Sequence, residues 1–378
     1  MSRPGLLTLL LCQAACFAPV GNGKDPSGGS TTGPTDSTDT ADPTGDAEAS
    51  STPTTGSPDT EPRTCTWKRI GDDGPPLPRY GHSLDLAANG TLIMFGGRAT
   101  LTAGPNFSDV WQYKNEWQML MSPLPPNGPT PRRGFAAAVH PDLGLVMFGG
   151  DDDINNSKES FPIETWVYAN NAWKQLPSAS SPPGSANATM EYHPASSKIV
   201  MFGGHDIDGN MVPDTWLLDV DGEWTTAATD PAPEPRAFHT MAREPGGDLL
   251  MHGGCTMSVQ TCPNPSTFRD DTWLWDGAWT LVDAGGVARP PSGAMTPGTA
   301  DGTIFRFARG LQVIDTYQWL GDRWMLLNNP SANPPDTMEK FAVAYYPASN
   351  DVILYGGLRG ETSNDETWTF HCDDPVGS

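Results

Sequence analysis

The sequence carries two acid-rich clusters whose residue types match the ligands of calcium. Asp151-Asp152-Asp153 follows one glycine pair, and His205-Asp206-Ile207-Asp208-Gly209-Asn210 follows another. Alternating carboxylate and amide oxygens are donors that Ca²⁺ prefers, so Asp206, Asp208 and Asn210 are weak candidate ligands. The second run lacks the additional ligand and the distal Glu of a twelve-residue calcium loop, and solvated turn acids are the commoner case. We therefore expect no cofactor, with Ca²⁺ as the alternative.

Other chemistry finds little support in the chain. The sequence contains no Gly-x-Ser-x-Gly, His-Glu-x-x-His, phosphate-binding loop or dinucleotide fingerprint. A net charge of −23 argues against nucleic acid as a partner, because phosphates would be repelled. The 41 glycines and 38 prolines leave little room for long helices. No apolar run reaches the ~18 residues of a membrane-spanning helix.

The first residues have the order of an export signal. Arg3 precedes the apolar run Leu6–Leu11, and the small residues Ala14-Ala15 precede Cys16. This end resembles the lipobox of bacterial lipoproteins, which implies lipidation at Cys16; cleavage without lipidation is the alternative. Residues 17–64 are rich in Ser, Thr, Pro and Asp, which predicts a disordered tether. We expect a signal at 1–16, a tether at 17–64 and a folded domain at 65–374.

This order predicts an exported protein. The resemblance implies a bacterial lipoprotein at the outer membrane or cell surface, and otherwise a periplasmic or extracellular protein. Contact with the membrane would then be through the lipid alone.

The remainder of the chain repeats about every fifty residues. Glycine pairs end apolar segments at Gly96, Gly149, Gly203, Gly253 and Gly356, and a sixth copy around Ile304–Gly310 has lost the pair. An acid, a small residue and an aromatic residue follow each copy, as in Asp109-Val110-Trp111 and Asp271-Thr272-Trp273. Each copy contains about four short β-rich segments; in the first these are 81–87, 91–95, 110–113 and 117–120. All thirteen Trp fit repeat positions, which favours an architectural role for them.

These landmarks resemble the kelch motif. The resemblance covers residues 65–372 in six copies and implies an all-β, six-bladed β-propeller with four antiparallel strands per blade. Four copies also carry the Arg that opens the motif, namely Arg79, Arg132, Arg236 and Arg289. The second aromatic of the last copy lies at the other end of the domain, at Trp67. The N-terminal strand should therefore complete the last blade.

Two disulfides are expected in this domain. Cys372 lies four residues after Trp368, and Cys65 lies two before Trp67. In the first copy both offsets fall on Asn115, so the two cysteines should be neighbours where the ring closes. Cys255 and Cys262 bracket one loop and should form the second bridge. Paired cysteines fit an oxidising compartment.

Function is expected on the face that carries the long segments after the glycine pairs. Variable loops on a rigid scaffold usually carry specificity. The binding-face candidates are Arg98, Asp151, Asp152, Asp153, His205, Asp206, Asp208, Arg269 and Arg359. His82 and His239 share one repeat position on the innermost strand, so both are expected to line the channel.

We expect a monomeric, non-catalytic binding or scaffold module for an unknown protein or glycan. The alternative is a glycan-processing enzyme resembling kelch-type sialate mutarotases. It would need two or more of Arg98, Arg269, Arg309 and Arg359 to meet an acid at one pocket.

Overall fold

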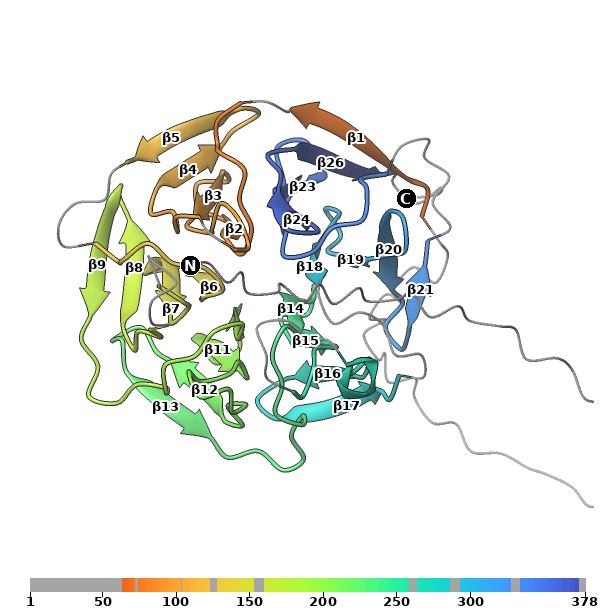
Figure 1. Ribbon diagram of the computed structural model, residues 1–378. Helices are drawn as coiled ribbons and strands as arrows, with labels where there is room; N and C mark the ends of the chain where they lie inside the picture. Colours follow the sequence, from red (N-terminus) through yellow and green to blue (C-terminus); the bar gives the residue numbers. More distant parts are fainter. Residues whose placement is uncertain are drawn as a thin grey trace, which may run out of the picture. The chain divides into compact units, whose positions relative to one another are not determined.

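The chain folds into six blades arranged around a central axis (Figure 1). The computed structural model describes residues 63–71, 74–102, 104–122, 128–152, 160–257, 264–285, 293–327 and 334–373. Within these ranges there are six four-stranded antiparallel sheets, and the innermost strands contact one another in a closed ring. The predicted six-bladed kelch-type propeller is confirmed. The predicted signal, Cys16 and residues 17–62 of the predicted tether lie outside the described residues. Arg63, at the end of the predicted tether, is buried, and its backbone amide donates to the side chain of Gln318.

Blades 1 to 3 each run in chain order from the innermost to the outermost strand. Their strands are β2 (Ser83–Leu86), β3 (Leu92–Phe95), β4 (Val110–Tyr113) and β5 (Trp117–Met121); β6 (Ala136–His140), β7 (Gly144–Phe148), β8 (Thr165–Ala169) and β9 (Ala172–Leu176); and β10 (Thr189–His193), β11 (Lys198–Phe202), β12 (Thr215–Leu218) and β13 (Trp224–Ala227). The second strand of each blade is buried over most of its length, which explains its apolar composition.

Blades 4 and 5 keep this order, whereas blade 6 combines the two ends of the domain. Their strands are β14 (Thr240–Arg243), β15 (Leu249–His252), β16 (Thr272–Trp275) and β17 (Trp279–Asp283); β18 (Gly293–Pro297), β19 (Ile304–Arg309), β20 (Ile314–Trp319) and β21 (Trp324–Leu326); and β22 (Ala342–Tyr346), β23 (Asp351–Tyr355), β26 (Thr367–Cys372) and β1 (Cys65–Gly71). A small hairpin, β24 (Leu358–Arg359) and β25 (Thr362–Ser363), lies between β23 and β26.

Helices contribute almost nothing to this fold. The described residues contain one 3₁₀ turn, Pro265–Thr267, which Asn264 caps by accepting a hydrogen bond from the backbone of Ser266. No helix in these ranges has the length and apolarity that crossing a bilayer requires.

Strand β1 closes the ring by pairing with β26 along the edge of blade 6 (Figure 1). Cys65 is the direct partner of Cys372, and Trp67 is the partner of Phe370. The structure contains the predicted disulfide between Cys65 and Cys372, which are separated by 307 residues in sequence. Cys255 is also disulfide-bonded, and its predicted partner Cys262 lies outside the described residues.

The glycine pairs occur where one blade meets the next. Gly96 has φ +69°, and a Cβ there would lie 2.8 Å from the carbonyl oxygen of Arg132 and 2.9 Å from the ring of Phe135. Both neighbours belong to blade 2, so a larger residue would push the blades apart. Blade 5 has lost the pair, and a short turn instead joins β19 to β20, with Leu311 fully exposed.

In blades 1, 2 and 4 the motif arginine holds the blade together from within; Arg289, the fourth predicted motif arginine, lies outside the described residues. Arg79 is fully buried and donates to both carboxylate oxygens of Asp109 at 2.7 and 2.8 Å and to the carbonyl oxygen of Gly96 at 3.0 Å. The indole of Trp111 donates to the same carboxylate at 2.6 Å. Blades 2 and 4 repeat this unit with Arg132 and Arg236. The recurring arginine, acid and tryptophan therefore have a structural explanation, because a buried guanidinium needs a carboxylate and further acceptors.

Blade 6 lacks the motif arginine and replaces it with two residues. Met338 occupies the arginine position. Asn364 donates to the carbonyl oxygen of Gly356 at 3.1 Å, and Arg359 donates to Glu366 at 3.0 Å. The same groups are thus satisfied from the loop after the glycine pair.

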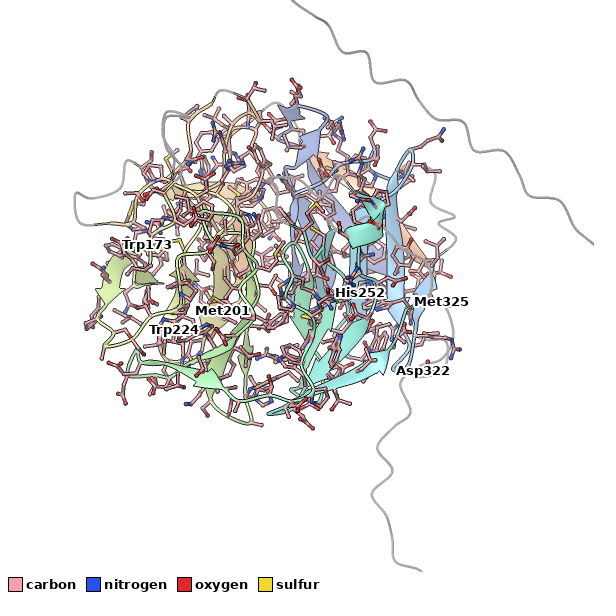
Figure 2. All side chains as sticks on the ribbon, turned by 60° about the horizontal axis from the view of Figure 1, so that its bottom comes forward. Trp173, Met201, Trp224, His252, Asp322 and Met325 are labelled. Carbon is pink, nitrogen blue, oxygen red and sulfur yellow. A yellow bond between two sulfur atoms is a disulfide. The ribbon has the colours of Figure 1, made fainter. Side chains whose placement is uncertain are left out.

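In four of the six blades, the outer tryptophan binds the preceding blade. The indoles of Trp117, Trp224, Trp279 and Trp324 donate to the hydroxyls of Thr367, Thr165, Thr215 and Thr272 at 2.8–3.0 Å. Figure 2 shows Trp173 and Trp224 among the side chains of the neighbouring blades 2 and 3. Trp173 departs from this pattern, because blade 1 has Val110 at the threonine position and the Trp173 indole nitrogen is buried without a hydrogen-bond partner.

Candidate ligand pocket at the mouth of the channel

The neck of the channel is formed by equivalent residues that precede the innermost strand of each blade. The described members are Gly81, Gly134, Asn187, Phe238 and Lys340, and all have positive φ angles between 57° and 65°. The equivalent residue of blade 5 lies outside the described ranges. We call these five residues the neck ring. Left-handed backbone is costly for residues other than glycine, so three members hold their side chains in place at an energetic cost.

Backbone hydrogen bonds join the neck ring from blade to blade. The amide of Gly81 donates to the carbonyl of Lys340 at 3.0 Å, and the amide of Gly134 donates to Gly81 at 2.9 Å. The amide of Asn187 donates to Gly134 at 2.7 Å, and that of Phe238 donates to Asn187 at 3.1 Å. These bonds explain the shared backbone conformation, because each residue must turn its amide toward the preceding blade. They also make the ring a rigid base for side chains above it.

A pocket of about 180 Å³ lies at the neck ring. Its wall includes Asp151 and His205, which directly follow glycine pairs, so the pocket opens on the face of the long loops. A larger chamber of about 1030 Å³ extends from the neck toward the short turns that join the first two strands of each blade. The two spaces share wall residues at the neck, among them His82, Phe135 and Phe341.

One side of the pocket is a buried charged cluster centred on Arg133. Its guanidinium donates to the hydroxyl of Tyr80 at 3.0 Å and to the carboxylate of Asp151 at 2.6 Å. Tyr80 is 1% exposed, and burial raises the pKa of its phenol although the charge of Arg133 opposes this rise. The Nε atom of Arg133 is buried without a hydrogen-bond partner.

Lys340, which lies 207 positions after Arg133 in the sequence, brings a second cation to the pocket. Its ammonium nitrogen lies 5.6 Å from the ring centroid of Tyr80 and 5.6 Å from that of Phe238, which are distances of cation–π contact. Burial, followed by the charge of Arg133, lowers the pKa of Lys340 to about 8. The surroundings of the Lys340 amine therefore disfavour its charged form.

The remaining wall is aromatic and amide in character. The side-chain amide of Asn187 lies 3.1 Å from Nε2 of His205, and Nδ1 of His205 lies 3.1 Å from the carbonyl oxygen of Asp206. Since the amide donates to Nε2, the proton of the neutral imidazole belongs on Nδ1. Phe161 packs edge-on against the His205 ring with a centroid distance of 5.6 Å.

The structure places two of the predicted binding-face residues, Asp151 and His205, in this pocket. Asp152 accepts a hydrogen bond from Thr130 at 2.9 Å beside it, and Asp153 lies outside the described residues. The carboxylate of Asp206 accepts hydrogen bonds from the amides of Asp208 and Asn210, so its own loop satisfies it. Among the described residues, no three His, Cys, Asp or Glu side chains are grouped to hold a metal ion.

The predicted arginines do not converge on the pocket. Arg98, a predicted binding-face residue, is 2% exposed and does not line the pocket. Its backbone bridges Tyr80 and Asn106, which draws it beneath the loops. Arg269 pairs with Glu234 at 2.7 Å, Arg309 with Glu339 at 3.6 Å, and Arg359 with Glu366, each away from the pocket wall.

His82 and His239 lie at the neck, but their rings pack between blades. The centroid of His82 lies 5.5 Å from that of Tyr355, and the centroid of His239 lies 5.6 Å from that of Phe202, both edge-on. Burial, followed by the charge of a motif arginine, lowers both pKa values to about 3. Both histidines are therefore neutral at ordinary pH, and Nε2 of His239 also lies 2.7 Å from the hydroxyl of Thr189.

Arg133, Phe238 and Lys340 were missed from the sequence. Each lies one or two residues after the position of the motif arginine, namely Arg132, Arg236 and Met338. The available signal was the residue type at the neck position, compared between the copies. This residue is Gly, Gly, Asn, Phe and Lys in the five described blades, so Phe238 and Lys340 stand out.

Blades built on glycine pairs, motif arginines and two spaced aromatic residues define a kelch-type β-propeller. The family model of the Attractin/LZTR1 β-propeller matches residues 59–280, and the chain belongs to this family. Human multiple epidermal growth factor-like domains protein 8 is 29% identical over 206 residues, covering 50% of this chain and 7% of that protein. The F-box/kelch-repeat protein At1g51550 of Arabidopsis thaliana is 26% identical over 220 residues, covering 53% and 42% respectively. The chain thus spans less than half the length of these relatives.

The fold is also similar to a solved structure. The structure of YjhT superposes with a TM-score of 0.57, covering 82% of this chain and 96% of that one. The sequence identity is 16%, so this likeness concerns the fold alone.

Proposed function

We propose that this chain is an exported, non-catalytic binding module that takes the terminal group of a glycan into the pocket at the neck ring. The observation that carries the proposal is the pocket itself, whose side chains are held on strained but hydrogen-bonded backbone. The pocket wall combines aromatic rings from Tyr80, Phe161 and Phe238 with polar groups of Asn187 and Arg133. A site of this composition suits a ligand with both apolar faces and hydrogen-bonding groups.

The size of the pocket supports recognition of a small group. About 180 Å³ lies below the ~300 Å³ at which drug-sized sites begin, so the pocket suits one residue at the end of a larger ligand. The order of residues 1–16 predicts an export signal and lipidation at Cys16, and this prediction supports the proposal of a lipid-anchored protein outside the cytoplasm. Labelling with a radioactive fatty acid, compared between the natural chain and a Cys16→Ser variant, tests the anchor.

A glycan array read with and without Ca²⁺ tests the binding function. The natural chain should bind a defined group of glycans, and Phe238→Asn should lose them, because Asn tolerates the positive φ but removes the aromatic wall. Leu326→Asn is the matched control, since Leu326 is 43% exposed on the outermost strand of blade 5. Equal binding by Phe238→Asn and the natural chain would place the ligand elsewhere.

One observation favours the alternative, an enzyme that processes glycans. The pKa of Lys340, lowered to about 8 by burial, lies in the range useful for proton transfer near neutral pH. Turnover of a bound sugar that Lys340→Gln abolishes would establish the enzyme and overturn the non-catalytic proposal.

A further inference from the structure

The chamber of about 1030 Å³ beyond the neck is a second space large enough for a ligand. The innermost strand of every blade lines it. At three boundaries between neighbouring blades, a small residue of one innermost strand shares a core cluster with a larger apolar residue of the next. These pairs are Ala138 with Met190, Ala242 with Met295, and Ala344 with Leu84. Each pair fills its boundary with apolar volume.

Strand pairing identifies the equivalent residues at the boundary between blades 1 and 2. Asp85 and Ala138 each pair with the residue two positions before the phenylalanine of a glycine pair. Ala137 and Met190 each pair with the residue one position before such a phenylalanine. This boundary therefore has an aspartate in the place of the small residue and an alanine in the place of the larger one.

Asp85 and Ala137 lie on the facing sides of these two blades. Their cross-strand partners, Ile93 and Met147, belong to one core cluster, and Ala137 packs against the same cluster. Because directly opposite residues of paired strands share one face of a sheet, Asp85 lies on the side of blade 1 that faces blade 2. Both residues also line the chamber. The boundary thus combines a carboxylate with a place from which the volume of a methionine side chain is missing.

The carboxylate of Asp85 is costly at this boundary. Its Oδ2 atom is buried without a hydrogen-bond partner. Burial raises the pKa of Asp85 to about 7; the hydroxyl of Ser83 opposes this rise, and the charge of Glu191 adds to it. An alanine, which blade 2 has at the equivalent position, would avoid this cost. A bound cation would offset it, because a positive charge stabilises the ionised carboxylate.

The chamber wall favours an organic cation. Of the described residues that line the chamber, Asp85, Glu191 and Glu244 are acidic and Arg243 is basic. Burial raises the pKa of Glu191 and the charge of Arg243 opposes this rise, so these two side chains interact with each other. The described part of the chain has no group of three His, Cys, Asp or Glu side chains arranged for a metal ion. An ammonium group needs fewer ligands, and an apolar wall suits its carbon chain.

We propose that the chamber binds a small primary amine, whose ammonium group pairs with Asp85 and whose alkyl chain fills the space at Ala137. Val139, which packs in the same cluster and lines the chamber, extends the apolar wall. A carboxylate and an ammonium group form a charge-assisted hydrogen bond, which is strongest where water is excluded. The site is independent of the proposed function, since Asp85 and Ala137 are not among the described residues that line the pocket at the neck ring.

The first test is titration calorimetry of the full chain with n-butylammonium chloride at pH 8 and constant ionic strength. We expect the natural chain to bind it and Asp85→Asn to bind at least tenfold more weakly. Glu191→Gln is the matched control, because Glu191 has the equivalent position in blade 3, and it should bind within about threefold of the natural chain. No binding by the natural chain overturns the proposal, and so does an equal loss in both variants, which would indicate general attraction of cations by the acidic wall.

The second test uses Asp85→Ala/Ala137→Met, which gives this boundary the pair found at Ala138 and Met190. It should melt at a higher temperature than the natural chain in sodium chloride, because it removes a buried carboxylate and adds apolar contacts. It should also bind no butylammonium. A lower melting temperature would mean that Asp85 serves the fold, and retained binding would place the amine elsewhere; either result overturns the proposal.

The third test varies the pH and the ligand. The affinity for butylammonium should fall as the pH drops below 7, because Asp85 takes up a proton while the amine stays charged. The other titratable or charged groups among the described residues of the chamber wall are His82, Glu191, Tyr192, His239, Arg243, Glu244 and Tyr345. An affinity unchanged between pH 8 and 5.5 would exclude Asp85 as the partner. Tighter binding of Ca²⁺, or of a lysine-containing peptide with blocked ends, would overturn the choice of a small amine.

Discussion

Replacing both cysteines of the closing bridge, as Cys65→Ala/Cys372→Ala, should destabilise the chain mainly through its unfolded state. Both residues are buried, at 4% and 1% exposure, so alanine is preferred to serine because it leaves no unpaired hydroxyl. The pairing of β1 with β26 extends from Cys65 to Gly71, so the folded ring retains its closing strand. The pocket lies at the neck ring and should keep its ligand affinity.

The size of the effect follows from the length of chain that the bridge closes. With a sequence separation of 307 between the two cysteines, the loop-entropy relation gives about 5.7 kcal/mol at 25 °C. Native bridges usually contribute about 2–5 kcal/mol, so we expect a loss within about 2–6 kcal/mol. The denaturant slope should rise, because an unfolded chain without the cross-link exposes more surface.

Urea unfolding of the natural chain and the double variant measures both quantities. Adding reductant to the double variant reports the separate contribution of the bridge at Cys255. A loss below about 1 kcal/mol with an unchanged slope would refute the argument, since it would mean that the chain ends stay paired in the unfolded state.

Two further predictions concern contacts between blades. Val110→Thr should raise the free energy of unfolding by about 1 kcal/mol, because it gives the buried Trp173 indole the acceptor found in other blades. The control Val146→Thr, at an equally buried position on β7, should instead lower the free energy of unfolding in urea by about 1–2 kcal/mol. A loss of stability in both variants would contradict the proposed role of the threonine hydroxyl. His82 and His239 have pKa values of about 3 in the folded chain and 6.5 when unperturbed, so the unfolded chain binds protons first as the pH falls and stability declines below pH 6.5. The double variant His82→Phe/His239→Phe places at both positions the aromatic residue that blade 2 has there. It should lose less stability than the natural chain between pH 6.5 and 5, by about 2 kcal/mol per histidine. An unchanged pH dependence of urea unfolding would exclude these residues as its source.

The blade architecture could be predicted because each repeat encodes it locally. A glycine pair is needed wherever the next blade approaches, as Gly96 shows, and the acid and tryptophan of Asp109-Val110-Trp111 are both partners of Arg79. Six copies of one local pattern therefore establish six blades. The pairing of Cys65 with Cys372 followed from the same register, since equal offsets in one repeat correspond to neighbours across a hairpin.

The ligand pocket depended on contacts that no single repeat contains. Arg133 and Lys340 are 207 positions apart and meet only because the ring closes through β1 and β26. Burial was equally non-local: Arg98 follows a glycine pair like other loop residues, yet the loops around it cover it completely. By itself the sequence determined the number and order of the blades, because each repeat pairs its strands over a short range, and the register of the repeat predicted that Cys65 and Cys372 meet where the ring closes. Only the tertiary structure decided which side chains share the central space and what charge they carry there, because each described member of the neck ring comes from a different blade.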